Sequence, residues 1–284
     1  MDYGTPDAPA PGVLRLTAPN PSAYTHTGTQ TYIVGTRDVA VIDPGPDLTA
    51  HLDAMLAAIG ARPVVAIVCT HTHRDHSPAA AALKRAIGAP IVGCAALSLE
   101  DVGPRADAAF DTLYVPDRVL GAGERIAGAD WALTAIATPG HTSNHLAFAL
   151  EDAGVLFTGD HVMGFATSVV SPPDGDMGAY MASLELLLGR DDCLYLPGHG
   201  PEVTNPQRLV RGMLGHRKQR EGQILRLLGA DPATIPAMVE RMYVGLDPRL
   251  VGAAGRSVLA HLLDLRARGK VSGEEHGAWA LAGD

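Results

Sequence analysis

The chain has 284 residues, of which 46% are hydrophobic and 19% are charged, and its mean hydropathy is +0.09. This composition excludes a disordered chain and is typical of one large α/β domain or of a domain with a small appendage. No apolar run approaches the roughly 18 residues that cross a bilayer, and residues 1–11 lack the basic and apolar regions of a signal peptide. We therefore expect a cytoplasmic protein without a membrane partner.

Charge is distributed unevenly along the chain. Up to Thr204 there are 10 Lys and Arg against 23 Asp and Glu, a net charge of −13, whereas from Asn205 onward there are 12 against 8, a net charge of +4. Together they give the formal net charge of −9. This asymmetry predicts that the acidic body and the basic tail contact different partners.

The three cysteines are too few and too scattered for a disulfide framework. Each has apolar neighbours, as a small buried side chain would. We therefore expect Cys69, Cys94 and Cys193 to be buried and unpaired.

The first two hundred residues predict short strands that alternate with helices. Apolar or β-branched runs between turn residues predict strands at residues 13–17, 31–35, 39–42, 64–69, 91–94, 132–137, 146–150, 155–158 and 194–196. Apolar residues at helical spacing predict helices at residues 48–59, 78–87 and 177–188. The run at 64–69 is continuously apolar, which indicates a strand that is covered on both faces.

From residue 205 the pattern becomes mainly helical. Asn205 and Pro206 are residue types favoured at a helix N-cap and first helical position, so we expect a long helix to about Leu228, ended by Gly229. Further helices are expected at 234–242 and 257–268, and a hairpin at 271–281. This order resembles a winged helix. We therefore expect two domains, at residues 1–204 and 205–284.

Four potential metal ligands follow the buried strand at 64–69. They are His71, His73, Asp75 and His76, a spacing that 12 His in 284 residues do not predict by chance. At the end of a strand, residues two apart project from the same side, so the first two histidines can reach one metal ion. Asp75 and His76 lie further on and can reach a second ion. Imidazole nitrogen and carboxylate oxygen suit Zn²⁺, and also accept Mn²⁺ or Fe²⁺.

Three later segments supply further candidate ligands. His141, Asp160 and His199 each follow a predicted strand, and each has a glycine directly before it. Glycine lets the backbone turn tightly and approach a site closely. Loops at strand ends are where α/β folds commonly carry their functional residues.

In this order, the motifs H-x-H-x-D-H, G-H-T, G-D and G-H-G resemble the metallo-β-lactamase superfamily over roughly residues 13–204. The resemblance implies an αββα sandwich with two divalent metal ions at one edge of the sheets. Zn²⁺ is the metal expected first. It implies that His71, His73 and His141 hold one ion and that Asp75, His76 and His199 hold the other. Asp160 would bridge the two ions.

Further segments are similar to the group of β-lactamase-like protein 2. They are residues 20–22, 27–35, 42–45, 180–184, 216–221 and 223–225. The resemblance to this group extends over nearly the whole chain and implies a C-terminal winged-helix domain; its members include single-stranded RNA endonucleases. The chain departs from the group at Gln30, where relatives often carry Asn, and at Pro78 and Ala79, where Gly-Gly is common. These departures weaken the inference about the substrate more than the inference about the metals.

Two adjacent cations can share a water and lower its pKa from 15.7 to about 7, so a metal-bridging hydroxide would be available for hydrolysis at neutral pH. The protein must then position the metals and donate a proton to the leaving group. Asp75, His145 and His161 are the candidates for catalytic or supporting roles beyond the metal ligands. Asp43 either orients a ligand histidine or forms a turn with Pro44 and Gly45.

The substrate class stays open at this stage. The chain is expected to be a hydrolase of single-stranded RNA guided by its basic tail, or of a small acyl molecule such as a thioester, lactone or β-lactam. A nucleic-acid-binding protein with structural metals is the third alternative. The net charge of −13 in the first part argues weakly against a long polyanion. The basic side chains of the tail are Arg211, Arg217, Lys218, Arg220, Arg226, Arg256, Arg266, Arg268 and Lys270. Tyr24 and His26 lie at the edge of the substrate pocket or in a surface loop, and the oligomeric state is left open.

Overall fold

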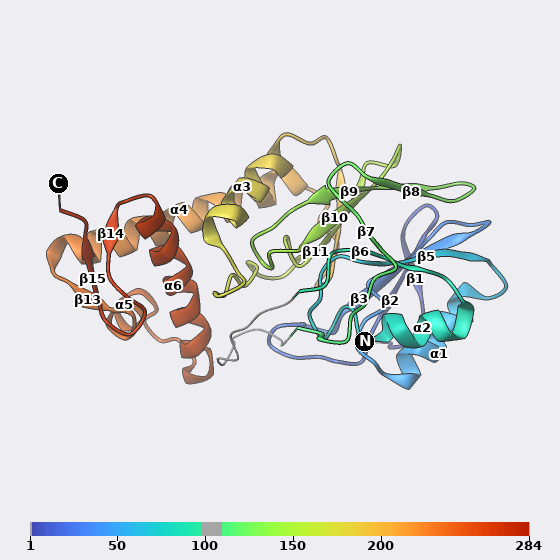
Figure 1. The fold of residues 1–284 in the computed structure, drawn as a ribbon, viewed down its shortest axis with the longest axis horizontal. Helices are drawn as coiled ribbons and strands as arrows, with labels where there is room; N and C mark the ends of the chain where they lie inside the picture. Colours follow the sequence, from blue (N-terminus) through green and yellow to red (C-terminus); the bar gives the residue numbers. More distant parts are fainter. Residues whose placement is uncertain (1, 98–109, 284) are drawn as a thin grey trace.

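The computed structural model describes residues 2–97 and 110–283 (Figure 1). Two β-sheets pack face to face, helices cover their outer faces, and a small domain made mainly of helices follows at the C-terminal end. The expected αββα sandwich is therefore confirmed. Among the helices of these residues, none is both long and apolar enough to cross a bilayer.

Within the described residues, the first sheet has seven strands that neighbour one another in chain order. They are β1 (Asp7–Ala10), β2 (Val13–Thr17), β3 (Gln30–Val34), β4 (Val39–Ile42), β5 (Val64–Cys69), β6 (Ile91–Gly93) and β7 (Arg118–Val119). Helices α1 (Thr49–Ile59) and α2 (Ala79–Ile87) connect the parallel strands β4, β5 and β6 and lie on the outer face of this sheet (Figure 1).

The second sheet has five strands in the described part of the chain, in the order β12-β11-β10-β9-β8. They are β8 (Arg125–Ala127), β9 (Ala132–Ala137), β10 (Leu146–Leu150), β11 (Val155–Gly159) and β12 (Leu194–Pro197). The helix α3 (Met177–Leu188) joins β11 to β12, which pair in parallel. It packs on the outer face of this sheet.

Alternation along β10 explains how the second sheet is covered on both faces. Phe148 lies in the core between the sheets, while Ala147 and Ala149 on either side of it pack toward α3. A strand with apolar residues at every position fits this arrangement, because successive side chains point to opposite faces. The small alanines let α3 approach closely.

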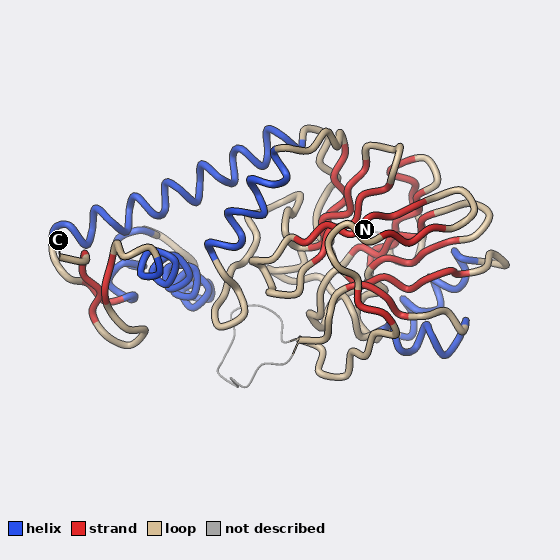
Figure 2. Tube along the Cα trace, turned by 45° about the horizontal axis from the view of Figure 1, so that its top comes forward, coloured by secondary structure: helices blue, strands red, loops and turns tan. Residues whose placement is uncertain are grey.

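The C-terminal elements form a third cluster. They are α4 (Pro206–Ala230), β13 (Ala233–Thr234), α5 (Ile235–Met242), a 3₁₀ turn (Pro248–Leu250), α6 (Val251–Ala267), β14 (Val271–Ser272) and β15 (Ala278–Leu281). Trp279 is fully buried at its centre. Figure 2 shows α4 as one continuous helix that runs from the sandwich to this domain.

The helix α4 belongs to two cores. Val210 and Met213 pack with α3, whereas Ile224 and Leu228 pack inside the C-terminal cluster. A single helix that contributes to both clusters ties their positions together. The division at residues 204 and 205 remains a prediction.

Several sequence predictions differ from the structure. Strands β1, β7 and β8 were not expected, and α4 continues through Gly229 to Ala230. Helix α6 begins at Val251 rather than Ser257, because a 3₁₀ turn leads directly into it and two glycines in its first turns lower its apparent helix propensity. Cys193 is exposed rather than buried, since it lies in the loop before β12, where its thiol is 3.4 Å from the Gly154 carbonyl oxygen.

Candidate metal centre

The seven expected ligands converge at one edge of the sandwich. Both sheets contribute to them. His71, His73, Asp75 and His76 follow β5 of the first sheet, whereas His141, Asp160 and His199 follow β9, β11 and β12 of the second. Asp75 is half-buried, and the other six side chains are buried.

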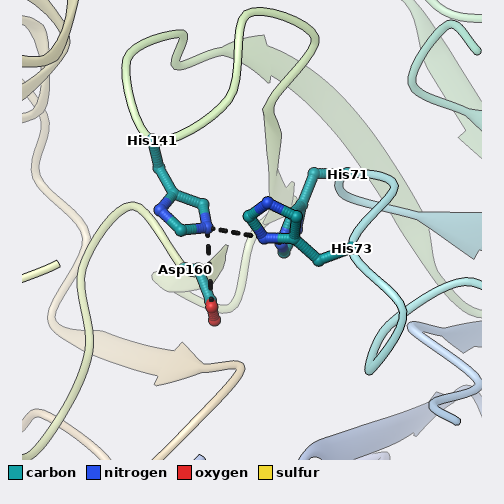
Figure 3. A group of neighbouring side chains, drawn as sticks. All are labelled: His71, His73, His141 and Asp160. Atoms are coloured by element: carbon teal, nitrogen blue, oxygen red, sulfur yellow. Dashed lines mark hydrogen bonds and ion pairs between the residues drawn. The ribbon is translucent and has the colours of Figure 1, made fainter. Parts of the chain in front are cut away.

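The first group of donors consists of His71, His73, His141 and Asp160. The Nδ1 atom of His73 lies 3.1 Å from Nε2 of His71 and 3.0 Å from Nε2 of His141. Asp160 Oδ2 lies 3.7 Å from the same His141 nitrogen. In Figure 3 dashed lines join His141 to His73 and to Asp160, and these side chains approach one another from different loops.

The second group consists of Asp75, His76, Asp160 and His199. The Nε2 atoms of His76 and His199 are 3.2 Å apart. Asp75 Oδ2 lies 3.1 Å and Asp160 Oδ2 lies 3.3 Å from His199 Nε2. Asp160 therefore takes part in both groups, as a carboxylate shared between two ions would.

Hydrogen bonds on the far side of the rings determine which nitrogens face the centre. The Nδ1 atoms of His141 and His199 donate to the carbonyl oxygens of Val169 (2.6 Å) and Gly28 (3.2 Å). His76 Nδ1 donates to Asp43 at 3.0 Å. A carbonyl or carboxylate oxygen only accepts, so each of these Nδ1 atoms carries a proton, and Nε2 is left to act as a ligand.

The donor set fits a divalent cation. A proton on His73 Nδ1 can be donated to only one of the neighbouring Nε2 atoms of His71 and His141, whereas a divalent cation can accept a lone pair from all three nitrogens. Two ligands of a tetrahedral Zn²⁺ lie about 3.3 Å apart, close to the observed nitrogen separations. In addition, Asp160 Oδ1 is buried and makes no hydrogen bond with the described residues, although it lies 3.4 Å from His76 Nε2.

The two groups differ in their electrostatics. Burial, together with the rings of His76 and His73, lowers the pKa of His71 well below its usual value. Burial also opposes charge on His199, but the Asp160 and Asp75 carboxylates outweigh it and raise its pKa to about 9. The pKa of His76 is raised well above its usual value for the same reasons. A cation entering the second group therefore has to displace protons.

Asp43 supports the ligands from behind. Its carboxylate accepts hydrogen bonds from the Thr70 amide and hydroxyl, both at 2.8 Å, as well as from His76. The Thr70 hydroxyl in turn lies 2.9 Å from Nδ1 of His71. The sequence left two roles for Asp43, orienting a ligand histidine or forming a turn. The structure shows its carboxylate in contact with the predicted ligand His76, and its φ is +48°.

His145 and His161 lie behind the ligands and differ in their contacts. His145 accepts a hydrogen bond from the Asp160 amide at 3.2 Å, while its Nδ1 contacts the Thr138 hydroxyl at 2.8 Å. His161 is buried with no hydrogen-bond partner for either nitrogen among the described residues, and burial lowers its pKa to about 3. His145 can therefore position Asp160, whereas His161 fills space next to Tyr180.

Sequence reasoning missed several groups that orient the ligands. The carbonyl oxygens of Gly28 and Val169 hold two histidines, and every residue has such an oxygen, so no residue type signals them. Thr70 was also missed. Its position between the buried strand and the first histidine was the only signal that could have identified it.

A narrow cavity opens over the donors. It is lined by five of the expected ligands together with Tyr24, Met163 and Val169. Tyr24 is therefore at the edge of the site, as one of the two alternatives predicted. His26 instead packs its ring against Phe165, with 4.8 Å between ring centroids.

The basic residues of the tail do not form one exposed patch. Arg217 is buried, contrary to its expected position on a solvated or RNA-guiding face. Arg268 pairs with Glu221 and Asp264, and Arg256 pairs with Glu275. Exposed basic residues on α4 are Arg208, Arg211, Lys218 and Arg226, which lie away from its buried face.

Comparison with known families agrees with the fold and with the order of the motifs. A model of the metallo-beta-lactamase superfamily matches residues 24–199, and a model of the beta-lactamase associated winged helix domain matches residues 234–279. The expected winged-helix character of the C-terminal domain is thereby confirmed.

Individual relatives match most of the chain. The Beta-lactamase-like protein 2 homolog of Drosophila melanogaster is 31% identical over 91% of this chain and 89% of its own length. A protein named Atrochrysone carboxyl ACP thioesterase from Claviceps purpurea is 30% identical over 77% of this chain and 66% of its own length.

Solved structures share the architecture. A Beta-lactamase domain protein from Burkholderia ambifaria has a TM-score of 0.82 and 21% identity, covering 99% of this chain and 94% of that one. A second protein, solved in a di-iron-bound form, has a TM-score of 0.54 and 26% identity, covering 68% of this chain and 96% of that one.

Proposed function

The chain belongs to the metallo-beta-lactamase superfamily, and we propose that it is a two-metal hydrolase of a small acyl substrate, with a thioester as the leading candidate. The observation that carries the proposal is the pair of donor groups that share Asp160. Four donors on one side and four on the other, all buried except the half-buried Asp75, match the ligands of two divalent cations better than any structural role, because unpaired buried polar groups are costly.

The proposed ligands divide between the two ions as the two donor groups do. His71, His73 and His141 would hold one ion, Asp75, His76 and His199 the other, and Asp160 both. Zn²⁺ is the proposed metal, and Fe²⁺ and Mn²⁺ suit the same nitrogen and oxygen donors. When bound, such ions lower the pKa of a shared water and polarise the scissile carbonyl.

The remaining residues of the site have supporting roles in this proposal. The ring of His145 holds the backbone of Asp160, and Asp43 fixes the ring of His76. Asp75 is the ligand with the most solvent access, and its Oδ2 lies 3.4 Å from the Thr29 hydroxyl. Asp75 is therefore the proposed residue for proton transfer to the leaving group. The buried, unpartnered ring of His161 supports packing instead.

A small acyl substrate is supported by the surroundings of the site. The cavity over the donors is narrow and bordered by the apolar side chains of Met163 and Val169. One of the relatives is named as a thioesterase. Lactones and β-lactams contain the same kind of carbonyl centre and remain within the proposed class.

Cleavage of single-stranded RNA has weaker support. A long polyanion needs an exposed basic path toward the metals. In this chain Arg256 and Arg268 are paired with carboxylates, and the exposed Arg211 and Arg226 lie away from the buried face of α4. The net negative charge of the first two hundred residues also disfavours the binding of a polyanion.

The proposal is tested with purified protein reconstituted with Zn²⁺, Mn²⁺ or Fe²⁺. We expect hydrolysis of at least one thioester, lactone or β-lactam, and we expect Asp160→Ala to reduce kcat/KM by at least about 10³-fold, since it removes a ligand of both ions. Circular dichroism checks that the variant is folded. Activity on an RNA oligomer alone, with none on acyl compounds, would contradict the substrate assignment.

A further inference from the structure

A second cavity lies beside the metal centre, where α4 and α6 meet the loop that follows β11. Its volume is about 330 Å³. Tyr24, Met163 and Val169 line both this cavity and the narrow cavity over the metal donors. The two cavities therefore share a wall, and a substrate whose reactive group lies at the donors can extend past this wall into the second cavity.

Arg217 on α4 lines the second cavity and is almost completely buried, with 4% of its surface exposed. Its Nη atoms contact the carbonyl oxygen of Ser168 and, at 3.5 Å, the hydroxyl of Ser257. Its Nε atom is buried and has no hydrogen-bond partner among the described residues. These contacts orient the guanidinium but do not neutralise its charge.

Arg220 lies one turn further along α4 and lines the same cavity. Its guanidinium lies over the ring of Tyr243, at 4.3 Å from the centroid, and donates to Gln223 Oε1 at 2.9 Å and to the Met242 carbonyl at 3.3 Å. Its Nε atom is also buried without a partner within residues 2–97 and 110–283. The side chain is therefore held in place by neutral groups.

The absence of a counter-ion distinguishes these two arginines from others in the domain. Arg256 and Arg268 each pair with a carboxylate, whereas no carboxylate of the described residues pairs with Arg217 or Arg220. A buried guanidinium remains charged at any accessible pH, and leaving it without an anion costs free energy. The buried guanidinium of Arg217 and the half-buried guanidinium of Arg220, beside one cavity, therefore form a preorganised site for an anion.

We propose that this cavity binds an oxyanion, a carboxylate or a phosphate, at the end of the substrate distant from the scissile carbonyl. The inference rests on the proposed acyl hydrolase function. Guanidinium groups match the geometry of both oxyanions and bind them through paired hydrogen bonds. Phe165, Leu246 and Leu250 form apolar walls of the cavity, so the part of the substrate between the two ends is uncharged.

Matched substrate pairs test the charge preference. One pair is S-acetyl-4′-phosphopantetheine and S-acetylpantetheine, which differ by a phosphate. The other is S-lactoylglutathione and its diethyl ester, which differ by two carboxylates. We expect the metal-loaded enzyme to prefer the charged member of at least one pair by about tenfold or more in kcat/KM, as charge-assisted hydrogen bonds permit. The pair that shows the preference identifies the oxyanion.

Variants of α4 separate this subsite from a structural role. We expect Arg220→Gln to reduce the preference about tenfold, and Arg220→Lys to retain part of it, because lysine keeps the charge but not the planar fork. Arg226→Gln, an exposed arginine on the same helix, is the matched control and should retain the preference. An Arg220→Gln variant that loses activity equally on both members of a pair would overturn the proposal.

A binding measurement keeps the test independent of turnover. Calorimetry on metal-depleted protein with 4′-phosphopantetheine, pantetheine and glutathione reports the arginines without a contribution from metals. We expect the preferred charged compound to bind, and Arg220→Gln to weaken it about tenfold. If no thioester is hydrolysed but this binding is found, the proposed function fails and the subsite stands. If neither charged compound binds, the subsite is overturned.

Discussion

The carboxylate of Asp43 connects two of the ligand-bearing positions of the metal centre. It accepts a hydrogen bond from His76 and orients Thr70, whose hydroxyl contacts His71. Groups behind metal ligands fix the ring orientation and raise ligand basicity, so their loss commonly weakens metal binding. In the sequence, Asp-Pro-Gly is equally compatible with a simple turn. The contacts of Asp43 with Thr70 and His76 depend on the packing of β5, which lies further along the chain.

Asp43→Asn tests this role directly. Asparagine tolerates the left-handed backbone conformation at this position, so we expect the fold to remain. The amide is a weaker acceptor for His76, and we expect metal affinity to fall about 10- to 100-fold, measured by competition with a chromogenic chelator. Asp47→Asn, an exposed change nearby, is the control. Equal metal affinities in Asp43→Asn and Asp47→Asn would show that Asp43 does not support metal binding.

His261 offers a test of burial that is remote from the metal ligands. Both of its ring nitrogens are buried and lack hydrogen-bond partners in the described part of the chain. Burial, with smaller contributions from Arg217, His216, Arg220 and Arg268, lowers its pKa to about 3. Between pH 3 and pH 6.5 the unfolded chain therefore binds a proton that the folded protein does not, and stability must fall as the pH falls.

Replacing His261 by leucine should remove this contribution. We expect the free energy of unfolding of the wild type to decrease between pH 6.5 and pH 5 more steeply than that of His261→Leu, by up to about 1.4 kcal/mol per pH unit. Urea unfolding at several pH values provides the measurement. His276→Leu changes an exposed histidine and should keep the wild-type slope. Parallel curves for the wild type and His261→Leu would show that the ring is protonated when folded.

At the level of elements, the start of α4 was predictable and its end was not. Asn205 and Pro206 occupy the expected positions, and the Asn205 side chain accepts from the Arg208 amide at 3.2 Å. Gly229 was expected to end the helix, but it continues by one residue because Leu228 packs in the C-terminal core. Local residue types identify a cap, whereas tertiary packing decides how far a helix extends.

The cap of α4 is testable by substitution. Asn205→Ala removes the acceptor for the first turn, and we expect it to lower the free energy of unfolding by about 1 kcal/mol. Asn205→Asp keeps an acceptor oxygen and should change the free energy of unfolding by only a few tenths. Chemical denaturation at constant metal content gives both values. A loss of the same size in both variants would show that the side chain acts through other contacts.

At the scale of the whole molecule, apolar runs between turn residues predicted most strands and the motif order indicated the sandwich, but neither showed how distant segments meet. Arg217 and Arg220 line a cavity beside the proposed metal centre because α4 packs against two cores. Their sequence context is only that of a charged helix, and the structure alone distinguishes a buried guanidinium from a solvated one.

The proposed ligands come from both sheets, so bound metals should stabilise the whole sandwich. Donors after β5 belong to the first sheet and those after β9, β11 and β12 to the second. A ligand that binds only the folded state stabilises it by about 4 kcal/mol at a free concentration 1,000 times Kd. We expect chelation to lower Tm by several degrees, and Zn²⁺ to restore it. His73→Ala combined with His199→Ala removes one ligand from each group and should abolish the metal-dependent part of Tm. An identical Tm with and without metal, under conditions where elemental analysis shows binding, would mean that the ions do not hold the two sheets together.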